Sequence, residues 1–356
     1  STAIIQADRK AGAGLSIVIF LLGRELGMRT APAFLSAWMI AVDGALVDVS
    51  RFMLLDTFLL FFGFSAIWAH QKWLRQGRVS TILLTGILCA LSFSIKWTGL
   101  TFLLLIGLRQ FSYLMACRGS LGFSSRGVLL IFSLLLMPCV FYVMQFYLHF
   151  QLLPKSGTGD AFMSPAFQST LLGNDFSLTS DYVRPGFFEK FIEINRAMYS
   201  ASANMTSSHP YGSSWYSWPL MLKPIYLWFG EFDKRIYMLG NPLIWWGSLA
   251  FTLAAIQVVV ILRSTRWAPG VGFLLTGWAL NWFPFSEIRR VMFIYHYLPS
   301  LVFSILLVGS FLNALKSPIL PVLFFAFLAL CLSVYYSLVT YGLSPCWSIL
   351  WMPSWT

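Results

Sequence analysis

Ten apolar stretches, each long enough or nearly long enough to cross a bilayer, run through most of this chain. A helix needs about 20 mainly apolar residues to span the hydrocarbon core. The predicted spans are residues 13–28, 31–47, 52–70, 80–95, 97–115, 127–148, 241–262, 267–284, 291–312 and 318–340. Hydrophobic residues make up 58% of the 356 positions and charged residues only 10%, which argues against a soluble enzyme, a disordered protein and a nucleic-acid-binding domain. The sequence therefore predicts an all-α polytopic membrane protein.

These spans divide the chain into four parts. We expect an N-terminal membrane bundle over 1–148, a long loop over 149–240, a C-terminal membrane bundle of four spans over 241–340, and a tail over 341–356. The spans 80–95 and 97–115 could be one long helix, but Lys96 at their junction and Gly99 soon after it favour a tight turn between two helices.

The charged residues predict the orientation. Alternate turns carry eleven basic residues against the single acid Glu25; the basic residues are Arg24, Arg29, Lys72, Arg75, Arg78, Arg109, Arg118, Arg126, Arg263, Arg266 and Lys316. Cytoplasmic loops are enriched in Lys and Arg, so these turns are predicted to be cytoplasmic. The long loop and the C-terminal tail then lie on the outer face. The net charge of +11 is thus mostly a topology signal, and no nucleic-acid partner is expected.

The opposite turns carry four basic residues at helix ends: Arg51, Lys96, Arg289 and Arg290. Ionisable residues at such a depth are costly and are functional candidates. They could converge on one anionic group at the outer leaflet, such as a lipid phosphate. Alternatively, they neutralise the acids of the same turns, which are Asp43, Asp48, Asp56 and Glu287. Within this set, Arg51 could bind an anion that Asp56 orients, or the two could form a simple ion pair at a helix start. Lys96 could be a phosphate counter-charge or a lysine reaching to the interface.

The end of the long loop is rich in aromatic and hydroxyl side chains. Its segment Asn204–Leu220 contains His209, Tyr211, Trp215 and Trp218. Aromatic faces together with hydroxyl groups suit a carbohydrate ligand, and a histidine could donate to a sugar or phosphate oxygen. The alternative is an interfacial belt that rests the loop on the bilayer.

A second polar cluster opens the span 291–312. Arg290 and Tyr297 are seven residues apart and would share one face of a helix, with His296 beside it. Pro299 would kink that helix. Polar groups entering a lipid-embedded helix are expensive unless they meet a ligand or one another.

Several stretches resemble the dolichyl-phosphate-mannose–protein O-mannosyltransferases, membrane glycosyltransferases of the GT-C class. They are SRFMLLDTFLLFF, SIKWTGL, HPYGSSWYSWPLMLKPI, LGNPLIWW, RRVMFIYHYLPSLVF and WMPSW, and they cover roughly residues 15–356 in the family's order. The two patterns HPYxSxWYxWPL and RxMFxYHYLP are highly specific together.

The resemblance implies a GT-C type bundle, of whose eleven helices about ten are expected here. It implies transfer of mannose from polyprenyl-phosphate-mannose to Ser or Thr of a protein, with inversion. Arg51 and Lys96 would hold the lipid phosphate, supported by Asp56, and Arg290, His296 and Tyr297 would complete that pocket. The loop residues that would shape the donor or acceptor site are His209, Tyr211, Trp215 and Trp218.

The sequence departs from the family in two places. The 92-residue loop is too short for the β-trefoil domain of eukaryotic members, so the chain is similar to the bacterial type. A bacterial plasma membrane is then expected, or the endoplasmic reticulum membrane for a eukaryotic chain. The family's first span and its outer Asp-Glu pair, which is taken to supply the general base, have no counterpart, and the N-terminal arm offers Asp8 but no Asp-Glu sequence. The chain therefore looks truncated. Asp43, Asp48 and Glu287 are candidate bases, and nothing in the sequence selects one.

Other functions stay open. The chain could be a catalytically incomplete remnant, a subunit that binds lipid-phosphate-sugar, or a GT-C transferase with a non-protein acceptor. A transporter is disfavoured, because the ionisable residues gather at one face and no halves repeat. No cofactor and no metal are expected, since the four histidines are scattered. The expected partners are the bilayer, the polyprenyl-phosphate-sugar donor and a Ser/Thr-containing protein; the oligomeric state is open.

Overall fold

The computed structural model describes residues 2–52, 54–116, 125–178, 182–204, 208–230, 234–261 and 268–340. The chain forms two compact units. The first unit comprises the described parts of 1–138, 209–288 and 292–356, and the second comprises those of 139–208 and 289–291. The predicted boundary at residue 148 thus lies inside the second unit.

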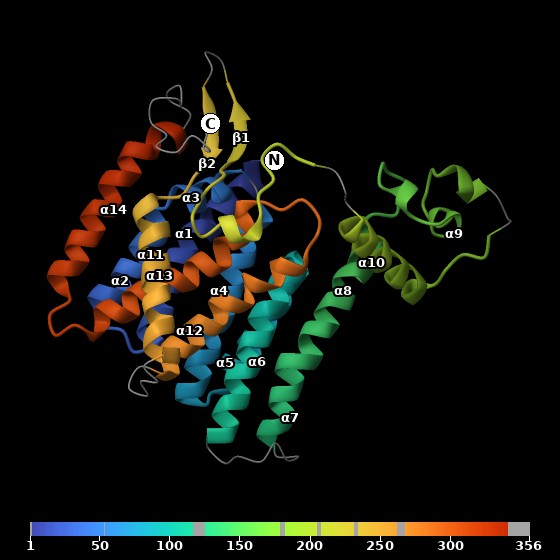
Figure 1. The fold of residues 1–356 in the computed structure, drawn as a ribbon. Helices are drawn as coiled ribbons and strands as arrows, with labels where there is room; N and C mark the ends of the chain where they lie inside the picture. The colour runs from blue at the N-terminus through green and yellow to red at the C-terminus, as the bar shows by residue number, and fades with distance from the viewer. Residues whose placement is uncertain are drawn as a thin grey trace. The chain divides into compact units, whose positions relative to one another are not determined.

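The first unit is a helical bundle (Figure 1). Its N-terminal helices are α1 (Thr2–Glu25), α2 (Thr30–Val42), α3 (Gly44–Arg51), α4 (Leu55–Gln76), α5 (Val79–Ile95), α6 (Leu100–Ala116) and α7 (Ser125–Ile131), followed by the π-helical segment η2 (Phe132–Leu136). Its C-terminal helices are α11 (Pro242–Ile256) with the π-helical η7 (Gln257–Ile261), α12 (Ala268–Leu280), α13 (Leu298–Ala314) and α14 (Ile319–Thr340).

Short elements join these helices at one end of the first unit. They are the 3-10 turns η1 (Trp97–Gly99), η5 (Trp215–Ser217), η8 (Phe283–Glu287) and η9 (Ile294–Tyr297), and an antiparallel hairpin of β1 (Ile225–Phe229) and β2 (Arg235–Met238). The hairpin register shifts between Tyr226 and Trp228, which is the signature of a β-bulge.

The helix α13 lies at the centre of the core. Its apolar span is 78% buried, and it packs against α2, α11 and α12. Phe303 of α13 meets Phe64 of α4 with ring centroids 4.9 Å apart, and Phe102 of α6 completes the cluster at 5.3 Å from Phe64. Close backbone approach occurs where α5 meets η2, because a Cβ on Gly86 would lie 2.1 Å from the carbonyl oxygen of Ser133.

Among the described residues, five helices are long and apolar enough to cross a membrane, or six if α2 and α3 form one broken span. All ten predicted spans contain helix, but the count of ten crossings stays a prediction. Two helices have bounds that differ from the predicted spans, which themselves stay predictions. The helix α1 begins eleven residues before the predicted span 13–28, and the first helical residue of the span predicted at 291–312 is Ile294, in η9.

The predicted span 31–47 is also wrong as one helix, because it is broken at Asp43 with a bend of 56°. The reason is local: Asp43 has an extended backbone, and its carboxylate accepts the N–H of Leu46, capping α3. Between α5 and η1, in contrast, Lys96 is extended and interrupts the helices. The prediction of two helices rather than one long helix at this point is confirmed.

Three of the turns that were predicted to share a face lie together. Arg75, in the last turn of α4, bonds Glu25 at the end of α1 with 2.9 Å between Nη1 and Oε2. Arg29 donates to the carbonyls of Asn313 and Lys316 at the end of α13. These turns therefore occupy one end of the first unit. Which side of the membrane that end faces stays a prediction.

The second unit contains α8 (Met137–Leu152, from residue 139), the 3-10 turns η3 (Asp160–Phe162) and η4 (Asp175–Leu178), and the helices α9 (Pro165–Gln168) and α10 (Phe187–Ala203). Aromatic rings hold α10 on α8, with Phe191 5.3 Å from Phe146.

Candidate functional site

Asp56 and Lys96 form an ion pair in the first unit, with 2.7 Å between Asp56 Oδ2 and Lys96 Nζ. Asp56 lies in the first turn of α4, and Lys96 lies at the break between α5 and η1. Their exposure differs: 29% of the Lys96 side chain is accessible, against 6% of Asp56. Lys96 Nζ also lies 5.1 Å from the ring centroid of Tyr295, within the range of a cation–π contact. Lys96 is thus a partly exposed positive charge held in place by a buried carboxylate.

Tyr295 belongs to a group of four packed rings, which we call the aromatic wall: Tyr295, His296, Trp218 and Phe285. Tyr295 stacks on His296 with centroids 4.4 Å apart, and His296 stacks on Trp218 at 5.7 Å and 14°. Phe285 meets the edge of His296 at 5.1 Å. Tyr295 and His296 are half-buried, whereas Trp218 is fully buried. Trp218, predicted as a substrate-binding residue, is therefore a buried ring that packs against His296.

His209 and Tyr211 lie near the same wall through Phe293. His209 Nδ1 accepts the backbone N–H of Tyr211 at 3.1 Å, and the His209 ring lies 5.1 Å from Phe293, which stacks on Tyr295 at 5.5 Å. On its other side, Tyr211 stacks on Tyr226 of the hairpin at 5.6 Å. Both predicted residues therefore reach the vicinity of Lys96 through a continuous series of rings.

The hydroxyl of Tyr211 is in an environment that opposes ionisation. Burial raises the pKa of this hydroxyl, and the neighbouring Tyr237 raises it further. Tyr211 therefore offers a protonated O–H at neutral pH, which can donate to or accept from a ligand.

Trp215 joins the loop to α12. The indole N–H of Trp282 donates to the carbonyl of Trp215 at 2.9 Å, and the two rings lie 5.3 Å apart. This geometry gives Trp215 a part in docking the loop, and its predicted contact with substrate stays a prediction.

Arg51 and Asp56 do not form the helix-start pair that was one of the alternatives. Arg51 instead pairs with Asp48 in its own helix α3, with 3.8 Å between Nη1 and Oδ1, and Asp56 pairs with Lys96. Arg51 and Lys96 thus each contact an acid of these turns, and whether either also binds a phosphate stays a prediction. Arg51 is 26% exposed and keeps access to solvent.

Asp43, a candidate base, has a structural environment. Its carboxylate is fully buried and accepts three N–H groups, from Leu46, from Asn241 and from the indole of Trp245, at 3.1, 2.9 and 3.0 Å. A carboxylate so occupied ties α3 to the start of α11 and has little capacity to take a proton from a substrate. Asp48 is equally buried, whereas Glu287 is exposed at the end of η8.

Tyr297, predicted to bind phosphate, lies in the core. Its side chain is 2% exposed, its hydroxyl accepts the indole N–H of Trp278 at 3.1 Å, and its ring packs on Trp245. Arg290 and Tyr297 do not share the helix face that their spacing had predicted, because residues 288–293 are not helical. Pro299 does not kink a helix either; it lies in the first turn of α13, where its missing N–H costs little.

Arg289 and Arg290 belong to the second unit. The expectation that Arg290 joins Arg51 and Lys96 on one phosphate therefore stays a prediction.

The sequence reasoning missed Tyr295 and Phe285. Both lie inside the segment that it singled out, but helical spacing drew attention to Tyr297 instead. A 3-10 turn over Ile294–Tyr297 directs Tyr295 toward Lys96, and the aromatic density of residues 283–297 was the available signal.

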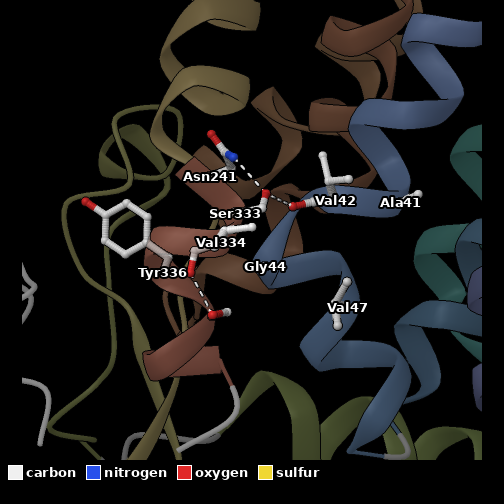
Figure 2. Close-up of a pocket in the computed structure, with 9 residues that line it drawn as sticks. Ala41, Val42, Gly44, Val47, Asn241, Ser333, Val334 and Tyr336 are labelled. Atoms are coloured by element: carbon white, nitrogen blue, oxygen red, sulfur yellow. Dashed lines mark hydrogen bonds between the residues drawn. The ribbon is translucent and has the colours of Figure 1, made fainter. Parts of the chain in front are cut away.

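Two pockets flank α3. One, of about 240 Å³, lies between the α2–α3 break and α14, where Asn241 donates to Ser333 and Ser333 donates to the carbonyl of Val42 (Figure 2). The other, of about 270 Å³, lies between α1, α3 and α4. Ala41 and Val47 line both pockets. Neither lining includes the Asp56–Lys96 pair or the aromatic wall.

Within the described ranges, no three His, Cys, Asp or Glu side chains are grouped so as to hold a metal ion. The expectation of metal-independent chemistry is untested by this finding.

Two family descriptions match the chain. Residues 9–154 match the family described as dolichyl-phosphate-mannose-protein mannosyltransferase, and residues 187–355 match the C-terminal four-transmembrane region of protein-O-mannosyltransferase.

Curated relatives match in part. Dolichyl-phosphate-mannose–protein mannosyltransferase 1 of Candida albicans is 35% identical over 177 residues, which are 46% of this chain and 20% of that protein. The protein of the same name in Saccharomyces cerevisiae is 32% identical over 151 residues, covering 38% of this chain and 18% of that protein. Protein O-mannosyl-transferase 2 of Drosophila pseudoobscura is 35% identical over 160 residues, covering 40% and 21%. The chain thus spans about a fifth of the length of these relatives.

A solved structure shares the fold. A chain of the Saccharomyces cerevisiae protein O-mannosyltransferase Pmt1-Pmt2 complex bound to the sugar donor superposes with a TM-score of 0.90, at 19% identity, over 99% of this chain and 80% of that chain.

Proposed function

Because the chain belongs to the protein O-mannosyltransferase family, we propose that it transfers mannose from a polyprenyl-phosphate-mannose donor to Ser or Thr hydroxyls of proteins. The observation that carries this proposal is the partly exposed Lys96, held by Asp56 and bordered by Tyr295 and His296. A cation beside flat ring faces suits a ligand that joins a phosphate to a sugar. The named activity of the curated relatives agrees with this reading.

In the proposed reaction, the acceptor oxygen forms a bond to the anomeric carbon of mannose from the face opposite the phosphate. The bond from that carbon to the phosphate oxygen breaks, and its electron pair leaves with the polyprenyl phosphate. Lys96 stabilises the negative charge that grows on this leaving group, and because Asp56 already positions the ammonium, little reorganisation is needed during reaction. The sugar lies against Tyr295 and His296, and the configuration inverts.

The acceptor hydroxyl must lose its proton to a base. Of the three candidate carboxylates, Asp43 is occupied by three donors and Asp48 is buried, so Glu287 is the one exposed to solvent. We retain Glu287 as the candidate within this sequence. The alternative function, binding of the lipid-phosphate-sugar without transfer, applies if no carboxylate of this chain serves as base.

We also place the site on the outer or luminal face of a bacterial plasma membrane or an endoplasmic reticulum membrane. The support is the excess of basic residues on the turns at the opposite end, such as Arg24, Arg29 and Arg75. Labelling of a cysteine introduced at Ser286, which is exposed, by a membrane-impermeant maleimide in intact cells would support this orientation. Labelling only after lysis would contradict it.

The test of the function uses proteoliposomes that contain the chain, polyprenyl-phosphate-mannose and a Ser/Thr-rich peptide, with Lys96→Met as the matched control. Mannosylated peptide from the native chain, and at least tenfold less from Lys96→Met, would support a protein O-mannosyltransferase with Lys96 in the donor site. Donor binding without transfer would indicate the binding-only alternative. Absence of both, in a folded chain, would refute the proposal.

A further inference from the structure

The helix α10 in the second unit packs with only part of its surface. Phe187 and Phe191 meet the rings of Tyr147 and Phe146 on α8 at 5.6 and 5.3 Å. Asn195, one turn further on, accepts the hydroxyl of Tyr142 at 2.5 Å. These residues recur every four positions and form one face of the helix. That face is the side by which α10 is fixed to α8.

Next to the packed face runs a row of exposed apolar residues. Phe188, Ile192 and Tyr199 are 69%, 46% and 64% exposed. At 100° per residue they fall within about 40° of one another around the helix axis. We call them the apolar row. Beyond it, Arg196 and Ser200 are exposed and polar. Around its axis α10 therefore presents a packed side, an apolar side and a polar side in turn.

The position of α10 along α8 fixes its depth in a membrane. The apolar helix that contains α8 runs from Gly127 to Leu152, 26 residues with mean hydropathy 2.4. At 1.5 Å per residue it is about 39 Å long, against a hydrocarbon core of about 30 Å. With the N-terminal end of this helix placed at the opposite boundary of the core, the surplus of about 9 Å falls on its last six residues. The contacts of α10 fall on Tyr142 to Phe150, so they lie at the boundary between the hydrocarbon and the headgroups at the C-terminal end of α8.

The surface of α8 at this level is apolar and exposed. Met144, Leu148 and Leu152 follow one another at intervals of four and are 52%, 50% and 75% exposed. An exposed apolar helix face in a membrane-spanning segment is covered by lipid chains. The helix α10 packs on α8 at the same level (Figure 1), so its apolar row lies close to this exposed apolar face.

We propose that α10 is an interfacial helix, whose apolar row of Phe188, Ile192 and Tyr199 is inserted into the leaflet at the C-terminal end of α8. Helices with this distribution of side chains lie in the membrane plane with the apolar side about 5–10 Å below the headgroups, and tyrosine is enriched at that level. The ligand of this surface is therefore phospholipid. The inference does not depend on the proposed transfer activity.

The capping of α10 supports a helix that stays intact at the surface. Glu189 accepts the backbone N–H of Gly186 at 2.7 Å, which closes the first turn. Glu193 accepts the N–H and the hydroxyl of Ser164. The acidic side chains of α10 are thus directed to the protein's own loop, and the apolar row is left to the membrane.

The test is site-directed spin labelling of the full chain in phosphatidylcholine vesicles that also contain phosphatidylglycerol. The five native cysteines are first replaced by serine or alanine. Single cysteines at Phe188, Ile192 and Tyr199 then carry the label, and Arg196 and Ser200 provide matched controls on the polar side of the same helix. Collisions with lipid-soluble oxygen and with a water-soluble nickel complex are measured at each position.

We expect labels in the apolar row to collide mainly with oxygen, at a depth of about 5–10 Å, and labels on Arg196 and Ser200 to collide mainly with nickel. Equal nickel access at all five positions would overturn the proposal, since the row would then face water. Protection from both reagents would also overturn it, because a protein surface, such as a second copy of the chain, would then cover the row. Unchanged circular dichroism and a single size-exclusion peak for each labelled protein show that it is folded.

Discussion

The ion pair of Asp56 and Lys96 makes a quantitative prediction, because its two partners are unequally buried. Replacing Lys96 by methionine removes the positive charge and leaves a carboxylate that is 6% exposed without its counter-ion. Loss of one partner from a fully buried pair costs about 3–5 kcal/mol, and Lys96 is partly hydrated, so we expect about 3 kcal/mol here. Replacing Asp56 by asparagine instead leaves an ammonium that is 29% exposed and can turn to water, at a cost of about 1 kcal/mol.

The double variant Lys96→Met with Asp56→Asn carries no unpaired charge. Its destabilisation should be about 1.5 kcal/mol, well below the sum of the single changes, which gives a coupling energy of about 2.5 kcal/mol. The assay is equilibrium unfolding of the four proteins in mixed detergent micelles. Additive effects, or an equal cost for both single changes, would refute the reasoning from unequal burial.

Donor binding separates the two residues further. A charge-assisted contact to phosphate contributes about 1.5–3 kcal/mol, so Lys96→Met should weaken binding of polyprenyl-phosphate-mannose by about 10- to 100-fold. Asp56→Asn frees the ammonium from its competing carboxylate and should leave affinity unchanged or a few-fold tighter. If both variants lost affinity to the same degree, the pair would have a structural role alone.

Three further predictions concern stability and protonation. Asp43→Ala leaves three buried N–H groups, including the Trp245 indole, without an acceptor and should destabilise the bundle by about 3 kcal/mol in the same unfolding assay. The control is Asp175→Ala at an exposed position. Equal unfolding midpoints for the two variants would show that Asp43 does not connect α3 to α11. Gly86→Ala should lower the free energy of unfolding by about 2 kcal/mol, because its Cβ would meet the Ser133 carbonyl. Gly107→Ala has open space around it and should not lower the free energy of unfolding. An unchanged free energy for Gly86→Ala would mean that α5 and η2 separate readily. Slight burial raises the pKa of Asp160, but hydrogen bonds from Ser156, Gly157 and Asn174 outweigh it and lower the pKa below 3.8. The turn at Asp160 should therefore be stable above pH 3.8 and lose stability as the pH falls through the lowered pKa. A carboxyl NMR titration with a midpoint at or above 3.8 would contradict this.

The fold class followed from local rules. Runs of apolar residues predict helices, and the positions of basic residues predict which turns share an end, since both depend on transfer between water and lipid. The contacts of Glu25 with Arg75 and of Arg29 with the end of α13 agree with that arrangement. Hydropathy does not mark a break such as Asp43, because the Asp43 carboxylate accepts hydrogen bonds both from nearby Leu46 and from Asn241 and Trp245, about two hundred residues away.

The site was predicted less completely than the fold. Lys96, Asp56, His209 and His296 were singled out by specific residue patterns, and their roles in a site stay predictions. Their partners were not predicted, because an ion pair between α4 and the end of α5 is a tertiary contact that spacing along the chain cannot give. Tyr297 was assigned to the pocket by helical spacing and by the family resemblance, whereas in the structure it is buried and Tyr295, in the same 3-10 turn, contacts Lys96.

The two pockets beside α3 have a mechanical consequence. The helix α3 lies between pockets of about 240 and 270 Å³, and Ala41 and Val47 line both of them. A side chain that faces a pocket has fewer packing partners than one in a filled core. The segment that carries Asp48 and Arg51 is therefore held less tightly on these two sides, and it can shift with less loss of packing than a fully enclosed helix.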